Sequence, residues 1–245
     1  MKKAIVFGLA LSFALLGRGT AQEKFDHSGF DALLAKHVAK GRVEYAAWKA
    51  KDQNQLLIYL NKVGHADPKR LKPASERLAF FLNTYNALVI AQIIENYPLK
   101  NTRDVKGFND RLKHLVGGEP YTLDELEKKI RTDFPDPRIF FVLNAGAAGY
   151  PPLAPRAFRG DSLGAQLDSA QAAFLRDPKN VLLDKKAKVL YVSRLFEWHQ
   201  KEFEATTGSV RTFLKLNLPE EFQKEMESEP YELKYLTFDW SLNGK

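Results

Sequence analysis

The sequence has 245 residues, of which 44% are apolar and 27% charged, and a formal net charge of +7. This composition supports a substantial core and excludes a disordered, collagenous or low-complexity chain. Cysteine is absent, which excludes a disulfide framework, a thiolate metal site, a cysteine nucleophile and a lipid anchor on an amino-terminal cysteine.

Residues 1–21 have the pattern of a secretory signal peptide. Lys2 and Lys3 precede a run of 14 apolar or small residues, and the small residues up to Ala21 predict cleavage after that position. An uncleaved anchor is the alternative, but 14 helical residues span about 21 Å, less than a bilayer core of roughly 30 Å. Loss of Lys2, Lys3 and Arg18 lowers the net charge from +7 to +4. We therefore expect a bacterial periplasmic or secreted protein with no transmembrane anchor after cleavage.

The remaining residues, 22–245, predict a single globular domain. Helical and extended segments alternate without the regular βαβ rhythm of a parallel sheet, and neither an internal repeat nor a long polar linker divides the chain. The expected fold class is therefore α+β, helix-rich with a small sheet.

The first helix is predicted over residues 30–38, where apolar residues recur at helical spacing, and Gly41 ends it. His37 lies on its apolar face, where a hydrogen-bonded structural histidine is favoured over a metal ligand. A short extended segment at residues 43–45 and a second amphipathic helix around residues 56–63 follow.

A buried central helix is predicted at about residues 76–95. Its apolar residues surround the helix axis, and residues 78–94 carry no charge, which would also suit a membrane span. Asn83 and Asn86 argue against a span because amides are costly in lipid. We expect a core helix in which both amides find hydrogen-bond partners.

A tight hairpin is predicted at residues 116–119, before a helix that begins with a capping box at Thr122 and Glu125 and ends near Arg131. Residues 138–143 form a short β-branched and aromatic run, which predicts a buried strand.

The last third of the chain begins with a loop at residues 144–152, whose small residues allow other backbone or a ligand to approach closely. The elements expected after it are a helix capped by Ser162 and ended by Asp177-Pro178, a hairpin with arms at 181–183 and 189–192, a helix capped by Ser193, two short helices between 209 and 227, and an extended segment at 233–238.

Five segments match, in order, the motifs of one known family. They are residues 83–88 (N-x-Y-N-A-L), 123–128 (L-D-x-I-E-H), 136–145 (D-P-R-I-H-F-A-L-N-C), 150–153 (C-P-P-L) and 239–243 (D-W-S-L-N). Through them the sequence resembles the family catalogued as domain of unknown function 547, over nearly all of residues 22–245. Each motif alone is weak, but five in the right order make the resemblance specific.

The chain departs from this family's pattern at the positions with reactive side chains. Lys128 and Phe140 stand where the family shows His, and Ala145 and Tyr150 stand where it shows Cys. If typical members are thiol enzymes, the resemblance implies a thiolate activated by a nearby imidazole, which this chain cannot form. Tyr150 is a poor nucleophile at its ordinary pKa of about 10, and Phe140 cannot accept a proton. These substitutions together indicate a pseudoenzyme.

Four residues are the candidate ligand-binding positions: Arg138, Asn144, Tyr150 and Asn86. Arg138 and Asn144 flank the predicted strand, where each would suit a scaffold role or a site role equally well. The five histidines offer no helical metal-ligand pair, and the glycines form no phosphate-binding loop. We therefore expect no metal and no cofactor.

Two functions remain open. The first is a non-catalytic binding or structural module of the cell envelope, with an envelope component or a peptide as partner. The second is a hydrolase or transferase with a site rebuilt around Tyr150, Arg138, Asn144 and His199. A nucleic-acid partner is not expected of an exported protein with a net charge of only +4. A polar cluster containing His199 and a carboxylate would favour the enzyme.

Overall fold

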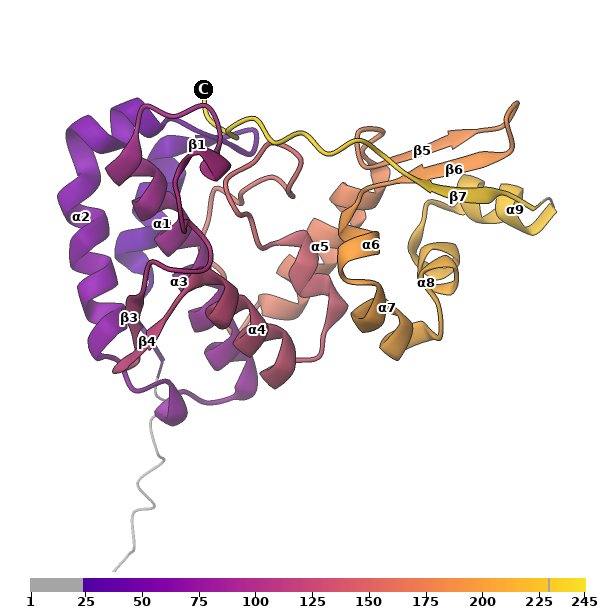
Figure 1. Cartoon of the computed structure of the whole chain (residues 1–245). Coiled ribbons are helices and arrows are strands. Elements are labelled where there is room, and N and C mark those ends of the chain that lie inside the picture. The colour runs from indigo at the N-terminus through magenta and orange to yellow at the C-terminus, as the bar shows by residue number, and fades with distance from the viewer. Residues whose placement is uncertain (1–23, 229) are drawn as a thin grey trace, which may run out of the picture.

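The structure is a computed structural model that describes residues 24–228 and 230–245, so the predicted signal peptide lies outside the described residues. The described part is helix-rich with three small sheets, which confirms the α+β class (Figure 1).

The α-helices are α1 (Ser28–His37), α2 (Tyr45–His65), α3 (Ala74–Asn96), α4 (Leu123–Asp133), α5 (Leu163–Arg176), α6 (Leu195–Trp198), α7 (Gln200–Thr207), α8 (Val210–Asn217) and α9 (Glu220–Ser228). The strands are β1 (Val38–Ala39), β2 (Arg42–Val43), β3 (His114–Val116), β4 (Glu119–Tyr121), β5 (Val181–Asp184), β6 (Val189–Val192) and β7 (Glu232–Tyr235). Three short 3-10 helices are η1 (Pro68–Arg70), η2 (Thr102–Asp104) and η3 (Pro137–Phe141).

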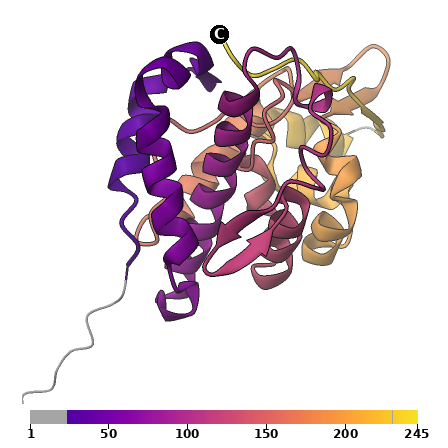
Figure 2. The same cartoon turned by 60° about the vertical axis from the view of Figure 1, so that its left-hand side comes forward.

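Helix α3 forms the centre of the core, as its all-round apolar pattern predicts. It packs beside α2 and α4, and every residue from 78 to 94 except Ala91 is buried (Figures 1 and 2). Among the described residues α3 is the one helix long and apolar enough to cross a membrane, and 89% of its apolar window is buried in the protein. Its Asn83 side chain both donates to the Phe158 carbonyl and accepts from the Phe158 amide, each at 2.8 Å. The expected partner for this buried amide is therefore present.

The predicted structural role of His37 is confirmed at the α1–α2 contact. Its Nε2 lies 2.6 Å from Oδ2 of Asp52, and its ring stacks on Trp48 with centroids 4.9 Å apart. Asp52 occupies a non-helical position (φ −135°) at a kink in α2 and also pairs with Lys36 at 2.7 Å. The kink brings one carboxylate to both partners.

The two local signals before residue 134 are confirmed. The β3–β4 hairpin turns at Gly117 and Gly118, whose φ values of 61° and 84° favour glycine. At the start of α4 the Thr122 hydroxyl accepts from the Glu125 amide at 3.1 Å, and the Glu125 carboxylate accepts from the Thr122 amide at 2.8 Å. This capping box satisfies two backbone donors at the helix end.

The predicted strand at residues 138–143 is wrong. The segment is buried as expected, but residues 137–141 form the 3-10 helix η3, which packs against α5 and α7. Pro137 presets a helical φ at the first position, and the Asp136 carboxylate caps the turn by accepting from the Arg138 amide at 3.0 Å. A short apolar run cannot distinguish a buried strand from a buried helical turn.

The other predicted elements of the last third form, with changes at two caps. The hydroxyl of Ser162 donates to Asp161 and makes no bond to the start of α5. The hydroxyl of Ser193 accepts from the Leu195 amide at 3.3 Å, but the N-cap residue of α6 is Arg194, and the single predicted helix is divided into α6 and α7 at His199. Strands β5 and β6 form the predicted antiparallel hairpin, and β7 adds in parallel to β6.

After β7 the chain runs back across the molecule to the β1–β2 turn, which Figure 1 shows in yellow. We call residues 236–245 the return segment. Its backbone pairs with both ends of the fold: Asn243 O accepts from Val43 N at 3.1 Å, and Asp239 O accepts from Gly149 N at 2.8 Å. The return segment therefore holds the loop at residues 144–152 against the N-terminal helices.

Candidate functional site

The loop at residues 144–152 is held by two buried amides that were candidate ligand-binding residues. Asn86 of α3 donates to Val142 O at 3.0 Å, and its Oδ1 accepts from Asn144 N at 3.1 Å. Asn144 donates to Pro151 O at 2.6 Å, and its Oδ1 accepts from Gly146 N and from the Asn243 side chain. Both amides are thus engaged with the scaffold.

Gly149 allows the return segment to reach this loop. A Cβ placed on it would lie 2.9 Å from the Asp239 amide nitrogen and 3.0 Å from the Asp239 carbonyl oxygen, both of them backbone atoms. Any side chain here would separate the two segments. The close approach expected of the small-residue loop is therefore made by the protein's own backbone.

Phe140, which stands at a substituted histidine position, is covered by His199. The two rings stack at a centroid distance of 3.8 Å with an interplanar angle of 15°. Phe140 is 3% exposed, and burial lowers the pKa of His199 to about 4. His199 is therefore neutral at pH 7 and lies against an apolar ring.

Tyr150, at a substituted cysteine position, belongs to an aromatic cluster. We define this cluster as Tyr150, Trp198, Phe238 and Trp240. The Tyr150 ring meets Phe238 edge-on at 5.0 Å and lies 6.3 Å from Trp198, the residue before His199. Burial, and to a smaller degree the charges of Glu127 and Asp124, raise the pKa of the Tyr150 hydroxyl. Tyr150 is therefore a weaker nucleophile than an exposed tyrosine.

Glu127 of α4 is a carboxyl with an altered pKa near these aromatic residues. From the sequence it is one of three acids on the capping-box helix that could suggest general acid or base work, but a favourable interaction with the helix dipole is the preferred interpretation there. Burial raises its pKa to about 7, although Arg131 and the Tyr85 hydroxyl lower it. A carboxyl that titrates near neutrality is suited to general acid or base chemistry. The raised pKa arises mainly from burial in the folded protein, so no local motif reports it.

The other two substituted positions differ in exposure and make no ring contact with the aromatic cluster. Lys128 is exposed on α4, next to the half-buried Glu127. Ala145 is 7% exposed, and its carbonyl accepts from the Thr102 hydroxyl at 3.5 Å. Phe140 and Tyr150 instead have ring neighbours that are consecutive in the sequence, His199 for Phe140 and Trp198 for Tyr150.

Arg138 is bound by two carboxylates and does not line the cavity described next. Its Nη2 lies 2.5 Å from Asp136 Oδ2, and its Nη1 lies 2.6 Å from Asp168 Oδ1. These hydrogen bonds, that to Asp136 above all, raise the pKa of the guanidinium. Arg138 joins the start of η3 to α5.

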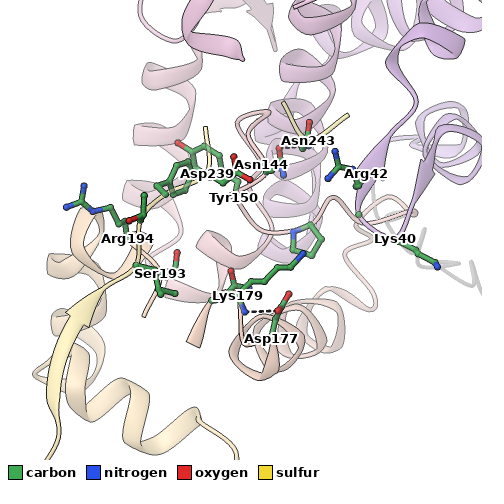
Figure 3. A pocket seen from close by; sticks show the side chains of 18 residues that line it. Lys40, Arg42, Asn144, Tyr150, Asp177, Lys179, Ser193, Arg194, Asp239 and Asn243 are labelled. Atoms are coloured by element: carbon green, nitrogen blue, oxygen red, sulfur yellow. Dashed lines mark hydrogen bonds between the residues drawn. The ribbon is translucent and has the colours of Figure 1, made fainter. Parts of the chain in front are cut away.

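A cavity of about 440 Å³ opens beside Tyr150, between the β1–β2 turn and the β5–β6 end of the molecule (Figure 3). Its charged and polar lining residues are Lys40, Arg42, Asn144, Asp177, Lys179, Asn180, Ser193, Arg194, Thr237, Asp239 and Asn243. Tyr150 and Phe238 supply aromatic walls. Of the four candidate ligand-binding residues, Asn144 and Tyr150 reach this cavity. Its cations come from segments far apart in the chain, so no local pattern could predict them.

A second, smaller cavity of about 150 Å³ lies beside Phe140, and Arg131 and Glu202 form an ion pair of 2.6 Å at its lining. Glu127 lines neither cavity. Across residues 24–228 and 230–245, groups of three or more His, Asp or Glu side chains placed to hold a metal ion are absent.

Fold and site together define a helix-rich α+β domain with an aromatic cluster around Tyr150 and a cation-lined cavity beside it. Residues 68–175 match a family described as "Protein of unknown function, DUF547", so this part of the chain is similar to that family. The match extends from η1 into α5 and includes Glu127, Phe140 and Tyr150. It does not include the return segment or Arg42 and Lys179 of the cavity. No curated protein and no solved structure matches the chain.

Proposed function

We propose that this chain is an exported, non-catalytic binding module, a pseudoenzyme within its family. The observation that carries the proposal is the stacking of Phe140 on His199 at 3.8 Å. A histidine at that family position would supply a base, but here a phenyl ring occupies it and the neighbouring imidazole is neutral at pH 7.

The second substituted position supports the same function. Burial raises the pKa of Tyr150, so its hydroxyl stays protonated at neutral pH and little of the nucleophilic phenolate forms. Arg138 and Asn144 are both engaged with protein atoms. The side chains that a rebuilt site would use are thus held in structural roles, while the neighbouring cavity of about 440 Å³ is of the size that binds small molecules.

Export and a place in the bacterial cell envelope are proposed from the signal-peptide pattern of residues 1–21. An envelope component or a peptide remains the proposed partner class.

A hydrolase or transferase is the second candidate, and Glu127 is the observation in its favour. Its pKa of about 7 suits a general acid or base, and its charge reaches both Tyr85 and Tyr150. His199 likewise has the carboxylate of Glu202 nearby. However, Glu127 lines neither the cavity beside Tyr150 nor the one beside Phe140, so neither cavity would bring a substrate to its carboxyl.

The test is an activity screen with a matched variant. The mature protein and Tyr150→Phe, which removes only the hydroxyl, are incubated with chromogenic esters, amides and glycosides. We expect both proteins to match the uncatalysed rate. If the rate exceeds background and this excess disappears in Tyr150→Phe with no change in melting temperature, the protein is a hydrolase or transferase instead.

A further inference from the structure

We propose that the cavity beside Tyr150 binds a small organic anion, with Arg42 and Lys179 as the groups that recognise its carboxylate or phosphate. This inference rests on the proposed binding function and adds the class of ligand to it. It starts from the charges that the fold brings together at this cavity.

Positive charge exceeds negative charge in the lining. The four cations are Lys40, Arg42, Lys179 and Arg194, and the two acids are Asp177 and Asp239. This leaves an excess of two positive charges, in a molecule whose mature net charge is only +4 by sequence. A concave lining with an excess of positive charge favours a ligand of negative charge.

Both acids already bind neighbouring protein groups. Asp177 Oδ1 accepts from the Lys179 amide at 2.9 Å, the bond drawn in Figure 3. Asp239 Oδ1 accepts from the Ser241 amide at 2.9 Å and from the Ser241 hydroxyl at 2.6 Å. Their carboxylates therefore stabilise turns and do not ion-pair with the four cations of the lining.

Lys179 and Arg42 are the cations placed to act together. Figure 3 shows Lys179 extended across the cavity toward the side of Arg42, whereas Lys40 and Arg194 project outward at the rim. Both Lys179 and Arg42 act on Asp239, where their charges help to lower the pKa of that carboxyl after its bonds to Ser241. The two cations thus reach one common space from opposite walls.

The two cations retain free donors. The Lys179 ammonium has no hydrogen-bond or ion-pair partner within residues 24–228 and 230–245. Arg42 uses Nε and Nη2 to bind Gly244 O, which anchors the return segment and leaves Nη1 for a ligand. An ammonium and a fixed guanidinium on facing walls suit a carboxylate or phosphate oxygen.

The rest of the lining suits an organic ligand with an apolar face. Tyr150 and Phe238 present aromatic surface. Ser193 is 5% exposed, and within the described part of the chain its hydroxyl accepts from the Leu195 amide and has no acceptor, so it can still donate. About 440 Å³ accommodates a sugar-sized molecule. A monosaccharide acid or sugar phosphate therefore fits both the charge and the size.

The test compares three forms of one sugar: glucose, glucuronate and glucose 6-phosphate. Binding to the mature protein is measured by calorimetry and by the shift in melting temperature. We expect one or both anions to bind and glucose to bind at least about tenfold more weakly, since a charged hydrogen bond contributes about that factor. Comparing glucuronate with glucose 6-phosphate shows whether the cavity prefers a carboxylate or a phosphate.

Two matched variants assign the effect to the cavity. Lys179→Met removes one lining charge, and Lys186→Met removes the same charge from the exposed turn between β5 and β6. We expect Lys179→Met to lose about tenfold in affinity for the anion and Lys186→Met to bind like the parent protein.

Three results would overturn the inference: no binding of either anion, equal binding of glucose and the anions, or equal loss in both variants. Equal binding of glucose would leave the proposed binding function standing. Turnover that depends on the Tyr150 hydroxyl would instead remove the proposed function, whichever sugar binds.

Discussion

His199, at the turn between α6 and α7, lies flat on Phe140 of η3, 3.8 Å from centroid to centroid. The phenyl ring excludes water from one face of the imidazole, and the loss of hydration favours its neutral form. The Phe140 ring thus suppresses titration of the neighbouring His199.

Replacing His199 by Phe should make the protein less sensitive to acid. The pKa of His199 is about 4 in the folded protein, against an ordinary value of 6.5, so the unfolded chain binds the proton first as the pH falls. Stability is therefore lost between pH 6.5 and pH 4, by on the order of 3 kcal/mol from this residue. Urea unfolding at pH 7 and at pH 4 should show a smaller difference for His199→Phe than for the parent. The exposed His65, changed to Phe, is the control; an equal change in the control would contradict the burial argument.

Replacing Glu127 by Gln should stabilise the protein at alkaline pH. The folded-state pKa of about 7 lies above the ordinary 4.5, so the folded chain holds the proton longer and loses stability as the pH rises from 4.5 through 7. Glutamine keeps the neutral form. We expect Glu127→Gln to gain about 1–2 kcal/mol at pH 8, allowing for partial exposure, and to match the parent near pH 4. The exposed Glu221→Gln should show no such gain. A gain that is the same at both pH values would argue against titration of Glu127.

Removing the Asn86 amide should destabilise the fold substantially. Asn86→Ala leaves the Val142 carbonyl and the Asn144 amide without their partner in the core. Two unsatisfied buried groups cost roughly 2–4 kcal/mol together. Asn96→Ala is the control, because its bond to Gln92 O at 2.8 Å lies within one helix at the end of α3. If urea unfolding gave equal losses for the two variants, Asn86 would have no special role in holding the loop.

A methyl group at Gly149 should separate the loop from the return segment. Gly149→Ala places Cβ about 3 Å from two backbone atoms of Asp239, and we expect a loss of roughly 1–3 kcal/mol from the forced backbone shift. Gly164→Ala, in α5, meets nothing within 4 Å and should keep or slightly raise stability. Thermal unfolding of both variants measures the difference, and a stable Gly149→Ala would mean that the return segment moves freely.

Short-range patterns were sufficient for many elements. The capping box at Thr122 and Glu125 and the glycine turn of β3–β4 involve residues within four positions of one another. The contacts that stabilise these two features are therefore made between residues close together in the sequence. The all-round apolar pattern of α3 likewise predicts its burial, because each face must be covered by some other element.

For residues 138–143 the short-range pattern predicted the wrong structure. Both a buried strand and a buried helical turn need an apolar run, and the choice depends on whether a neighbouring strand offers hydrogen bonds. Here α5 and α7 surround the segment, and Asp136 and Pro137 start a 3-10 turn. The roles of Arg138 and Asn144 likewise depend on residues that are not their sequence neighbours. Arg138 pairs with Asp168 of α5, and Asn144 donates to Pro151 O across the loop.

By itself the sequence determined that Phe140, Ala145 and Tyr150 supply neither an imidazole nor a thiol, because the identity of a side chain does not depend on where the fold places it. Only the tertiary structure decided that His199 covers Phe140 and that Arg42 and Lys179 face one cavity. Those relations arise from packing between distant segments, and the energies that select them are contacts and charges that no local pattern contains.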